Sequence, residues 1–186
     1  LLAGDASGPR VQDFTLPLGE RAHPPWRQLI AVDDGSLVAV DESGRLRLLR
    51  LKEAPQSYLA EVGILELGGA LDVGVASSGG MLAAAVGRRV TIIEASSLEP
   101  LAEVELEHAI SNDVWLAGGR LFVETARSAL RCFETEPEVV RQWSLPLPGC
   151  SLSGAPNVDA ARDAVAVSLL DGTLLHLDAK SGAVIA

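Results

Sequence analysis

The side chains that could support catalysis or bind a transition metal are few, and their spacing fits neither role. No two of the three histidines share a ligand spacing such as HExxH; they are His23, His108 and His176. Cys132 and Cys150 do not form a CxxC redox pair, and no serine stands in the GxSxG pattern of a nucleophilic serine. We therefore expect no catalytic residue and no transition-metal site, and we do not predict an enzyme.

Two acidic segments could bind calcium, which prefers carboxylate and carbonyl oxygens. They are Asp33-Asp34-Gly35-Ser36 and residues 159–163. Neither contains the DxDxDG ladder of a calcium-binding loop. Asp and Gly are also the residues that a tight turn between strands favours, because they tolerate positive φ. We interpret both segments as turns and expect neither a bound metal nor a cofactor.

The charge of the chain excludes several classes of partner. Asp and Glu number 25 against 15 Lys and Arg, which gives a net charge of −10. A protein that binds phosphate backbones needs a basic surface, so we expect neither nucleic acid nor an anionic membrane surface as a ligand. No apolar run reaches the roughly 20 residues of a membrane helix, so this part of the chain is not predicted to enter a membrane.

A short apolar strand that ends in turn residues occurs five times. Successive copies begin 36, 44, 40 and 44 residues apart; they are Leu1–Gly8, Leu37–Gly44, Met81–Arg88, Leu121–Ser128 and Val165–Gly172. This period is typical of a four-stranded propeller blade rather than of a helical repeat. The turns that end the copies are the surface elements on which any functional residue would stand.

A second apolar strand follows each copy and repeats its pattern. Its middle position is occupied by Leu48, Ile92, Cys132 and His176 in successive units. Apolar residues on both faces of a strand indicate burial between two neighbouring sheets. We therefore expect Cys132 and His176 to be core residues, and we do not expect a disulfide between Cys132 and Cys150.

The remaining strands complete the blades. Innermost strands are predicted at 28–32, 71–75 and 113–116, and half-exposed outer strands at 58–67, 101–106 and 139–145. These elements make one all-β domain of four-stranded antiparallel blades. The predicted blades cover approximately residues 1–27, 28–68, 69–107, 108–148 and 149–186.

The segment DGTLLHLDAKSGAVIA, residues 171–186, resembles the repeat of quinoprotein-type (PQQ-like) propellers. The unit that contains Met81 to Glu94 is similar to a divergent WD-type repeat, with Ile93 and Glu94 where that family has Trp and Asp. The chain departs from both families because it has no Gly-His pair, no Trp-Asp dipeptide and no blade-locking Trp at the positions that quinoprotein dehydrogenases use. The resemblance implies a β-propeller.

The strand overlay leaves about four blades, cut out of phase at both ends. We favour an excised part of a larger ring over a closed four-bladed ring. A partial ring has open sheet edges, which could pair with a second copy to form a homodimer.

Three functions remain open. The first is a non-catalytic interaction or sensory scaffold whose loops contact a protein partner. The second is an extramembrane domain of a bacterial transport permease, for phosphate or another anion, and the third is a quinoprotein-like, cofactor-binding enzyme fragment. A periplasmic or membrane-associated location is favoured over the cytoplasm. For the scaffold, the predicted binding residues are Asp41, Glu42, Arg88, Arg89, Arg127 and Asp171.

Overall fold

The computed structural model describes residues 2–5, 8–11, 26–52, 58–127, 129–135, 138–147 and 149–185, with side chains from residue 26 onward. All the regular elements in these ranges are β-strands. No helix in the described part of the chain is long and apolar enough to span a membrane. His23 lies outside the described residues.

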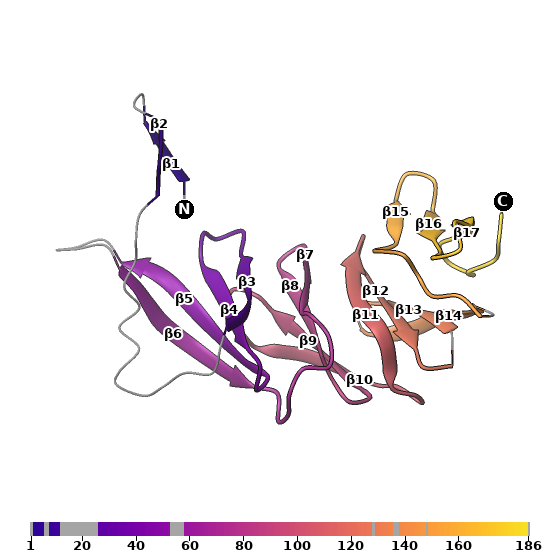
Figure 1. The fold of residues 1–186 in the computed structure, drawn as a ribbon, viewed down its shortest axis with the longest axis horizontal. Coiled ribbons are helices and arrows are strands. Elements are labelled where there is room, and N and C mark those ends of the chain that lie inside the picture. The colour runs from indigo at the N-terminus through magenta and orange to yellow at the C-terminus, as the bar shows by residue number, and fades with distance from the viewer. Residues whose placement is uncertain are drawn as a thin grey trace.

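The strands form a hairpin and four antiparallel sheets that follow one another along the chain (Figure 1). The hairpin pairs β1 (Leu2–Asp5) with β2 (Gly8–Val11). The first sheet consists of β3 (Trp26–Ala31), β4 (Leu37–Asp41), β5 (Arg45–Lys52) and β6 (Tyr58–Glu66). The second sheet consists of β7 (Ala76–Ser78), β8 (Met81–Val86), β9 (Arg89–Glu94) and β10 (Pro100–Glu105).

The third and fourth sheets repeat this arrangement. The third consists of β11 (Ile110–Ala117), β12 (Arg120–Thr125), β13 (Ala129–Glu134) and β14 (Val140–Pro146). The fourth consists of β15 (Asn157–Asp159), β16 (Ala164–Ser168) and β17 (Leu174–Asp178). Single bridges extend the fourth sheet, from Leu152 to Leu169 and from Leu177 to Val184. The all-β fold of four-stranded antiparallel blades is therefore confirmed.

The core lies between the sheets, because the second and third sheets pack both of their faces on neighbouring sheets. On β8, Leu82 and Ala84 contact the cluster shared with the first sheet, whereas Ala83 and Ala85 contact the cluster shared with the third. A further cluster joins the third and fourth sheets. This two-sided burial explains why the middle strands are apolar at consecutive positions, and it places Cys132 in the core at 0% exposure. His176 is only half-buried.

One predicted strand is displaced. Residues 71–75 were expected to form an innermost strand, but β7 begins only at Ala76. Leu71 and Val75 are buried in the core, although they lie in the segment that leads into the sheet. The backbone N–H and C=O of Val75 pair with the side-chain amide of Gln28 instead of with a neighbouring strand.

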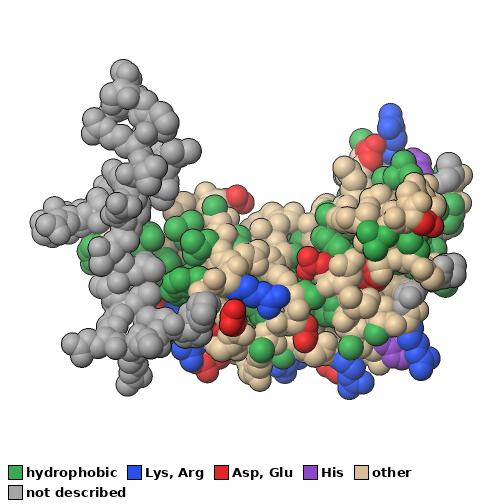
Figure 2. Space-filling view, in the orientation of Figure 1, with side chains coloured by type: hydrophobic (Ala, Val, Ile, Leu, Met, Phe, Trp, Pro, Cys, Tyr) green, Lys and Arg blue, Asp and Glu red, His purple; other side chains and the backbone are tan. Residues whose placement is uncertain are grey.

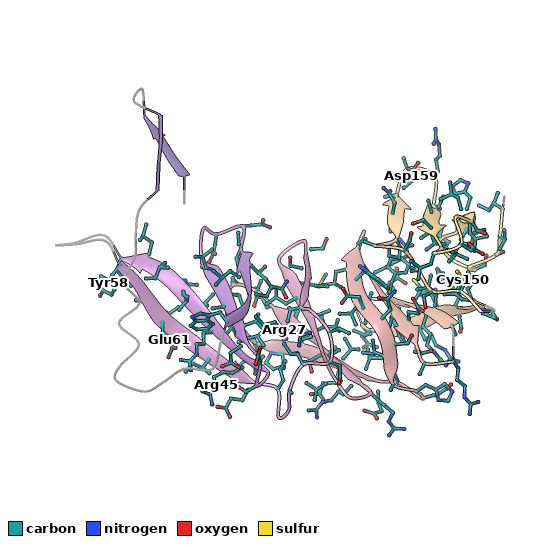
Figure 3. All side chains as sticks on the ribbon, viewed as in Figure 1. Arg27, Arg45, Tyr58, Glu61, Cys150 and Asp159 are labelled. Carbon is teal, nitrogen blue, oxygen red and sulfur yellow. The ribbon has the colours of Figure 1, made fainter. Side chains whose placement is uncertain are left out.

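The outer strands are the half-exposed edges that the sequence predicted. Each contains a β-bulge, since the pairing register shifts where Val62, Leu101 and Gln142 have no partner in the adjacent strand. Cross-strand ion pairs join β5 to the outer strand of the first sheet, where Glu61 of β6 binds Arg47 and Arg45 lies 2.8 Å from Glu66. Figure 3 labels Arg45 and Glu61 on these two strands. Bulges and edge charges both discourage pairing with foreign strands.

Candidate functional site

The middle turns of the four sheets occupy equivalent positions. They join the second strand to the third in each sheet and cover residues 42–44, 87–88, 126–128 and 169–173, of which 128 is not described. Consecutive antiparallel strands reverse direction, so these turns lie at the end of each sheet opposite to the turns that join the first and second strands. All six predicted binding residues lie in these turns or directly beside them.

The side chain of Asp41 forms hydrogen bonds within its own turn. Its side chain is 1% exposed, and Oδ1 accepts hydrogen bonds from Ser43 N at 2.9 Å, Ser43 Oγ at 2.6 Å and Arg45 N at 3.2 Å. An aspartate that caps a turn in this way fixes the backbone and does not face a partner. Asp41 therefore supports the loop that carries the exposed Glu42.

The two arginines beside the second middle turn have different roles. Arg88 is exposed, and its Nη2 lies 3.2 Å from Glu105 Oε1. Arg89 donates a hydrogen bond from Nη2 to the carbonyl oxygen of Leu67 at 2.9 Å, so it ties the end of the first sheet to the second. Arg88 therefore remains a candidate contact residue, whereas Arg89 also holds two sheets together.

Arg127 and Asp171 are exposed in the third and fourth turns. Asp171 Oδ1 accepts a hydrogen bond from Thr173 N at 2.8 Å, and this backbone bond holds the pKa of the Asp171 carboxyl below its usual value. Glu42, Arg88, Arg127 and Asp171 thus present charges of −, +, + and − on consecutive turns.

Polar side chains fasten neighbouring sheets to each other. Gln28 of β3 bonds both backbone groups of Val75, with Nε2 to O at 2.8 Å and N to Oε1 at 2.9 Å. Between the third and fourth sheets, Glu124 Oε2 accepts hydrogen bonds from Asn112 Nδ2 at 3.1 Å and from Leu152 N at 3.0 Å. Asn112 Nδ2 also contacts Leu152 O at 3.1 Å. These contacts hold the segments that precede β7 and β15 against the neighbouring sheet.

A tryptophan locks the third sheet to the fourth. Trp143 of β14 is 6% exposed, and its Nε1 donates a hydrogen bond to the carbonyl oxygen of Ala179 at 2.9 Å. The ring also contacts Phe122, with the centroids 6.1 Å apart. The sequence excluded a blade-locking tryptophan only at the positions that quinoprotein dehydrogenases use, and Trp143 makes a separate contact between two sheets. Sequence reasoning missed Trp143 because its partner lies 36 residues away.

A groove of about 620 Å³ lies between the second and third sheets. Its lining comes from the turn between β7 and β8, from β8, β9 and β10, and from the residues around the loop between β13 and β14; these are Gly79, Gly80, Met81, Ile92, Glu94, Leu101, Ala102, Thr135, Glu138 and Val139. Smaller cavities lie between the first two sheets, at about 170 Å³, and beside the innermost strands, at about 300 Å³.

The remaining chemistry-bearing residues are not grouped. Among the described residues, no three His, Cys, Asp or Glu side chains lie close enough together to hold a metal ion. Cys132 and Cys150 are both free thiols, and burial raises the pKa of Cys132 to about 12. In the acidic segments, Asp34 Oδ1 accepts Ser36 N at 2.9 Å and Asp159 Oδ1 accepts Ala161 N at 3.1 Å, as expected for turns. Basic and acidic side chains are intermixed along the lower edge of the molecule in Figure 2.

Comparison with known proteins identifies the repeat. A family model described as "Outer membrane protein assembly factor BamB" matches residues 25–186. No curated protein sequence matches the chain. The solved structure of BamB from Moraxella catarrhalis is similar, with a TM-score of 0.67 and 17% identity over 86% of this chain and 47% of that one.

Two further propellers have the same architecture. The β-propeller domain of Myceliophteria thermophila Cps50 (Swd1) has a TM-score of 0.66 and 16% identity over 89% of this chain and 55% of its own. The WD40 propeller domain of Doa1 has a TM-score of 0.60 and 16% identity, with the same two coverages. The chain therefore spans about half the length of the propellers that it matches.

Proposed function

Because the chain belongs to the family of the outer membrane protein assembly factor BamB, we propose that it binds other proteins as a rigid, non-catalytic scaffold during the assembly of outer-membrane proteins. The family match supports the assembly role. The arrangement of the middle turns supports the binding role and is the reason that we propose them as the binding face.

The observation that carries the proposal is the repetition of exposed charges on equivalent, firmly held turns. Glu42, Arg88, Arg127 and Asp171 stand on four consecutive sheets, and the turns of the first three sheets lead into strands whose central residues are buried. Rigid support lowers the entropy lost on binding, and a fixed pattern of both signs selects partners of complementary pattern. Rim charges of this kind mainly determine the association rate and its salt dependence.

A charge-reversal experiment tests the proposal. In the source organism, the full-length protein is replaced by the Arg88→Glu/Arg127→Glu variant, and outer-membrane protein levels are measured together with the proteins crosslinked to a photoreactive residue at position 42. We expect lower outer-membrane protein levels and loss of the crosslinked partner. Arg162→Glu is the matched control, because Arg162 is exposed in the turn between β15 and β16, at the opposite end of its sheet.

Two outcomes would contradict the proposal separately. If deletion of the whole protein leaves outer-membrane protein levels unchanged, the assembly role is wrong. If the double variant and the Arg162→Glu control lose the crosslinked partner equally, the middle turns are not the binding face. Equal thermal midpoints of the purified variants exclude misfolding as the cause.

A further inference from the structure

We propose that the groove between the second and third sheets is a second binding site, which holds an extended peptide with an apolar side chain next to a basic one. The groove is lined by the turn between the first and second strands of the second sheet and by the approach to β14. These elements lie at the sheet ends opposite to the middle turns. The inference therefore goes beyond the proposed function and does not depend on it.

The floor of the groove is apolar. Met81, Ala102 and Val139 pack on the core between the two sheets, and Ile92 belongs to that core. Leu101 is 54% exposed and is the extra residue of the β10 bulge, which turns it away from the regular pairing with β9. A volume of about 620 Å³ accommodates a large apolar side chain and the backbone that carries it. Such an anchor removes the exposed part of Leu101 from water.

The charged side chains among the described residues that line the groove are both acidic. They are Glu94 and Glu138, which are exposed, and no described Lys, Arg or His contributes to the lining. The ion pairs found among the described residues involve neither glutamate. Glu94 is held in place by Ser96 Oγ at 3.2 Å and by Ser97 Oγ at 2.9 Å, so its carboxylate is positioned without a neutralising cation. A Lys or Arg beside the apolar anchor would supply that cation.

The backbone of the groove wall is open to an incoming chain. Gly79 and Gly80 form the turn between β7 and β8 with φ of 58° and 77°, and a Cβ added at either residue would meet nothing within 4 Å. Space beside a backbone without side chains allows close approach of an extended peptide. The wall therefore leaves room for the peptide backbone, and the specificity of the site comes from the apolar floor and the two glutamates.

The geometry argues against two other occupants. A peptide that adds a strand to the sheet would pair with β10, but Pro100 lacks an N–H and the bulge at Leu101 interrupts the ladder. A second copy of this chain carries a net charge of −10, so it would bring further acids toward Glu94 and Glu138. The occupant favoured by charge complementarity is a basic segment of another protein.

Selection from a phage-displayed library of random short peptides tests the site. The purified full-length protein serves as the target, and enriched peptides are synthesised and measured by fluorescence anisotropy. We expect enrichment of sequences in which Lys or Arg adjoins a large apolar residue. Leu101→Asp should weaken their binding at least about tenfold, and Glu94→Gln/Glu138→Gln should weaken it several-fold and reduce its dependence on salt.

Leu174→Asp is the matched control, because Leu174 is 68% exposed on β17 and lies outside the groove. The proposal is overturned if no sequence is enriched, if acidic peptides are enriched, or if Leu174→Asp and Leu101→Asp weaken binding equally. Circular dichroism of each variant separates loss of the site from loss of the fold. If the proposed function is correct, the groove variants leave crosslinking from position 42 unchanged. Each of the two proposals can therefore be contradicted without contradicting the other.

Discussion

The indole Nε1 of Trp143 donates a hydrogen bond to the carbonyl oxygen of Ala179 at 2.9 Å, across the boundary between the third and fourth sheets. Both partners are buried, at 6% and 0% exposure. A buried carbonyl that loses its donor cannot turn to water instead. This one bond therefore joins the outer strand of one sheet to the last turn of the next.

Replacement of Trp143 by Phe should measure this contact. The variant keeps an aromatic ring on Phe122 but leaves the oxygen of Ala179 without its donor, so we expect a loss of about 2 kcal/mol in the free energy of unfolding. Trp115→Phe is the control, since Trp115 is only partly buried against the same cluster. Urea denaturation should give a loss at least about 1 kcal/mol larger for Trp143→Phe. Equal losses would mean that the hydrogen bond contributes nothing beyond packing.

Gly182 makes the close approach of Trp143 possible. It has a φ of 68°, and a Cβ added there would lie 2.6 Å from Cδ2 of the indole. Gly182→Ala should therefore cost about 1 kcal/mol of backbone strain plus about 1 to 3 kcal/mol for displacement of the ring. Gly172→Ala, at a φ of 87° with nothing within 4 Å, should show the strain alone. Similar midpoints of urea unfolding for the two variants would contradict the steric argument.

The sequence predicted the sheets because their signal is local. Middle strands such as β8 carry apolar residues on both faces, and the same pattern returns at each unit. This periodicity placed Cys132 in the core and located the four middle turns. The prediction of a strand at 71–75 was wrong because Leu71 and Val75 are buried like strand residues but do not pair with a neighbouring strand.

The inter-sheet contacts were not predictable in the same way. Trp143 and Ala179 are separated by 36 residues, and Glu124 and Leu152 by 28. No local pattern links such pairs, because their approach depends on how two complete sheets pack. For Asp41, the sequence indicated a turn. It did not indicate that one carboxylate oxygen of Asp41 accepts hydrogen bonds from three donors.

Glu124 should be far more important for stability than an exposed glutamate. It is 1% exposed, and its Oε2 accepts hydrogen bonds from Asn112 and from the backbone N–H of Leu152. Glu124→Ala leaves the buried N–H of Leu152 without an acceptor and removes one of the two acceptors of Asn112 Nδ2, so it should cost about 3 kcal/mol in the free energy of unfolding. Glu105→Ala, which removes an exposed ion pair with Arg88, should change stability by less than about 1 kcal/mol. If urea denaturation gives equal losses, the inter-sheet network is not a determinant of stability.

Acid should weaken the turn that follows β17. Asp178 Oδ1 accepts Ser181 Oγ at 2.7 Å and Ser181 N at 2.8 Å, and the hydroxyl bond is the main reason that the pKa of Asp178 is lowered. A lowered pKa contributes stability above the unfolded value of about 3.9, and that contribution is lost as the pH falls through the folded value. Ser181→Ala should therefore lower the Tm at neutral pH, and the difference should shrink in acid. Ser111→Ala, at an exposed position, should show no such pH dependence; a constant difference for Ser181→Ala would contradict the assignment.

The two cysteines should differ sharply in reactivity. Burial raises the pKa of Cys132 to about 12, so at pH 8 its thiol stays protonated and is covered by the core between the third and fourth sheets. Cys150 is only half-buried, in the segment between β14 and β15. We expect Ellman's reagent to modify Cys150 in the native protein and both cysteines in urea. In Cys150→Ser, native labelling should disappear and labelling in urea should remain. Rapid native labelling of Cys150→Ser would show that the core around Cys132 opens, which would contradict the packing of the third sheet against the fourth.

Because the thiol of Cys132 ionises more readily in the unfolded chain than in the core, the free energy of unfolding should also fall as the pH rises above the ordinary thiol pKa of about 8.5.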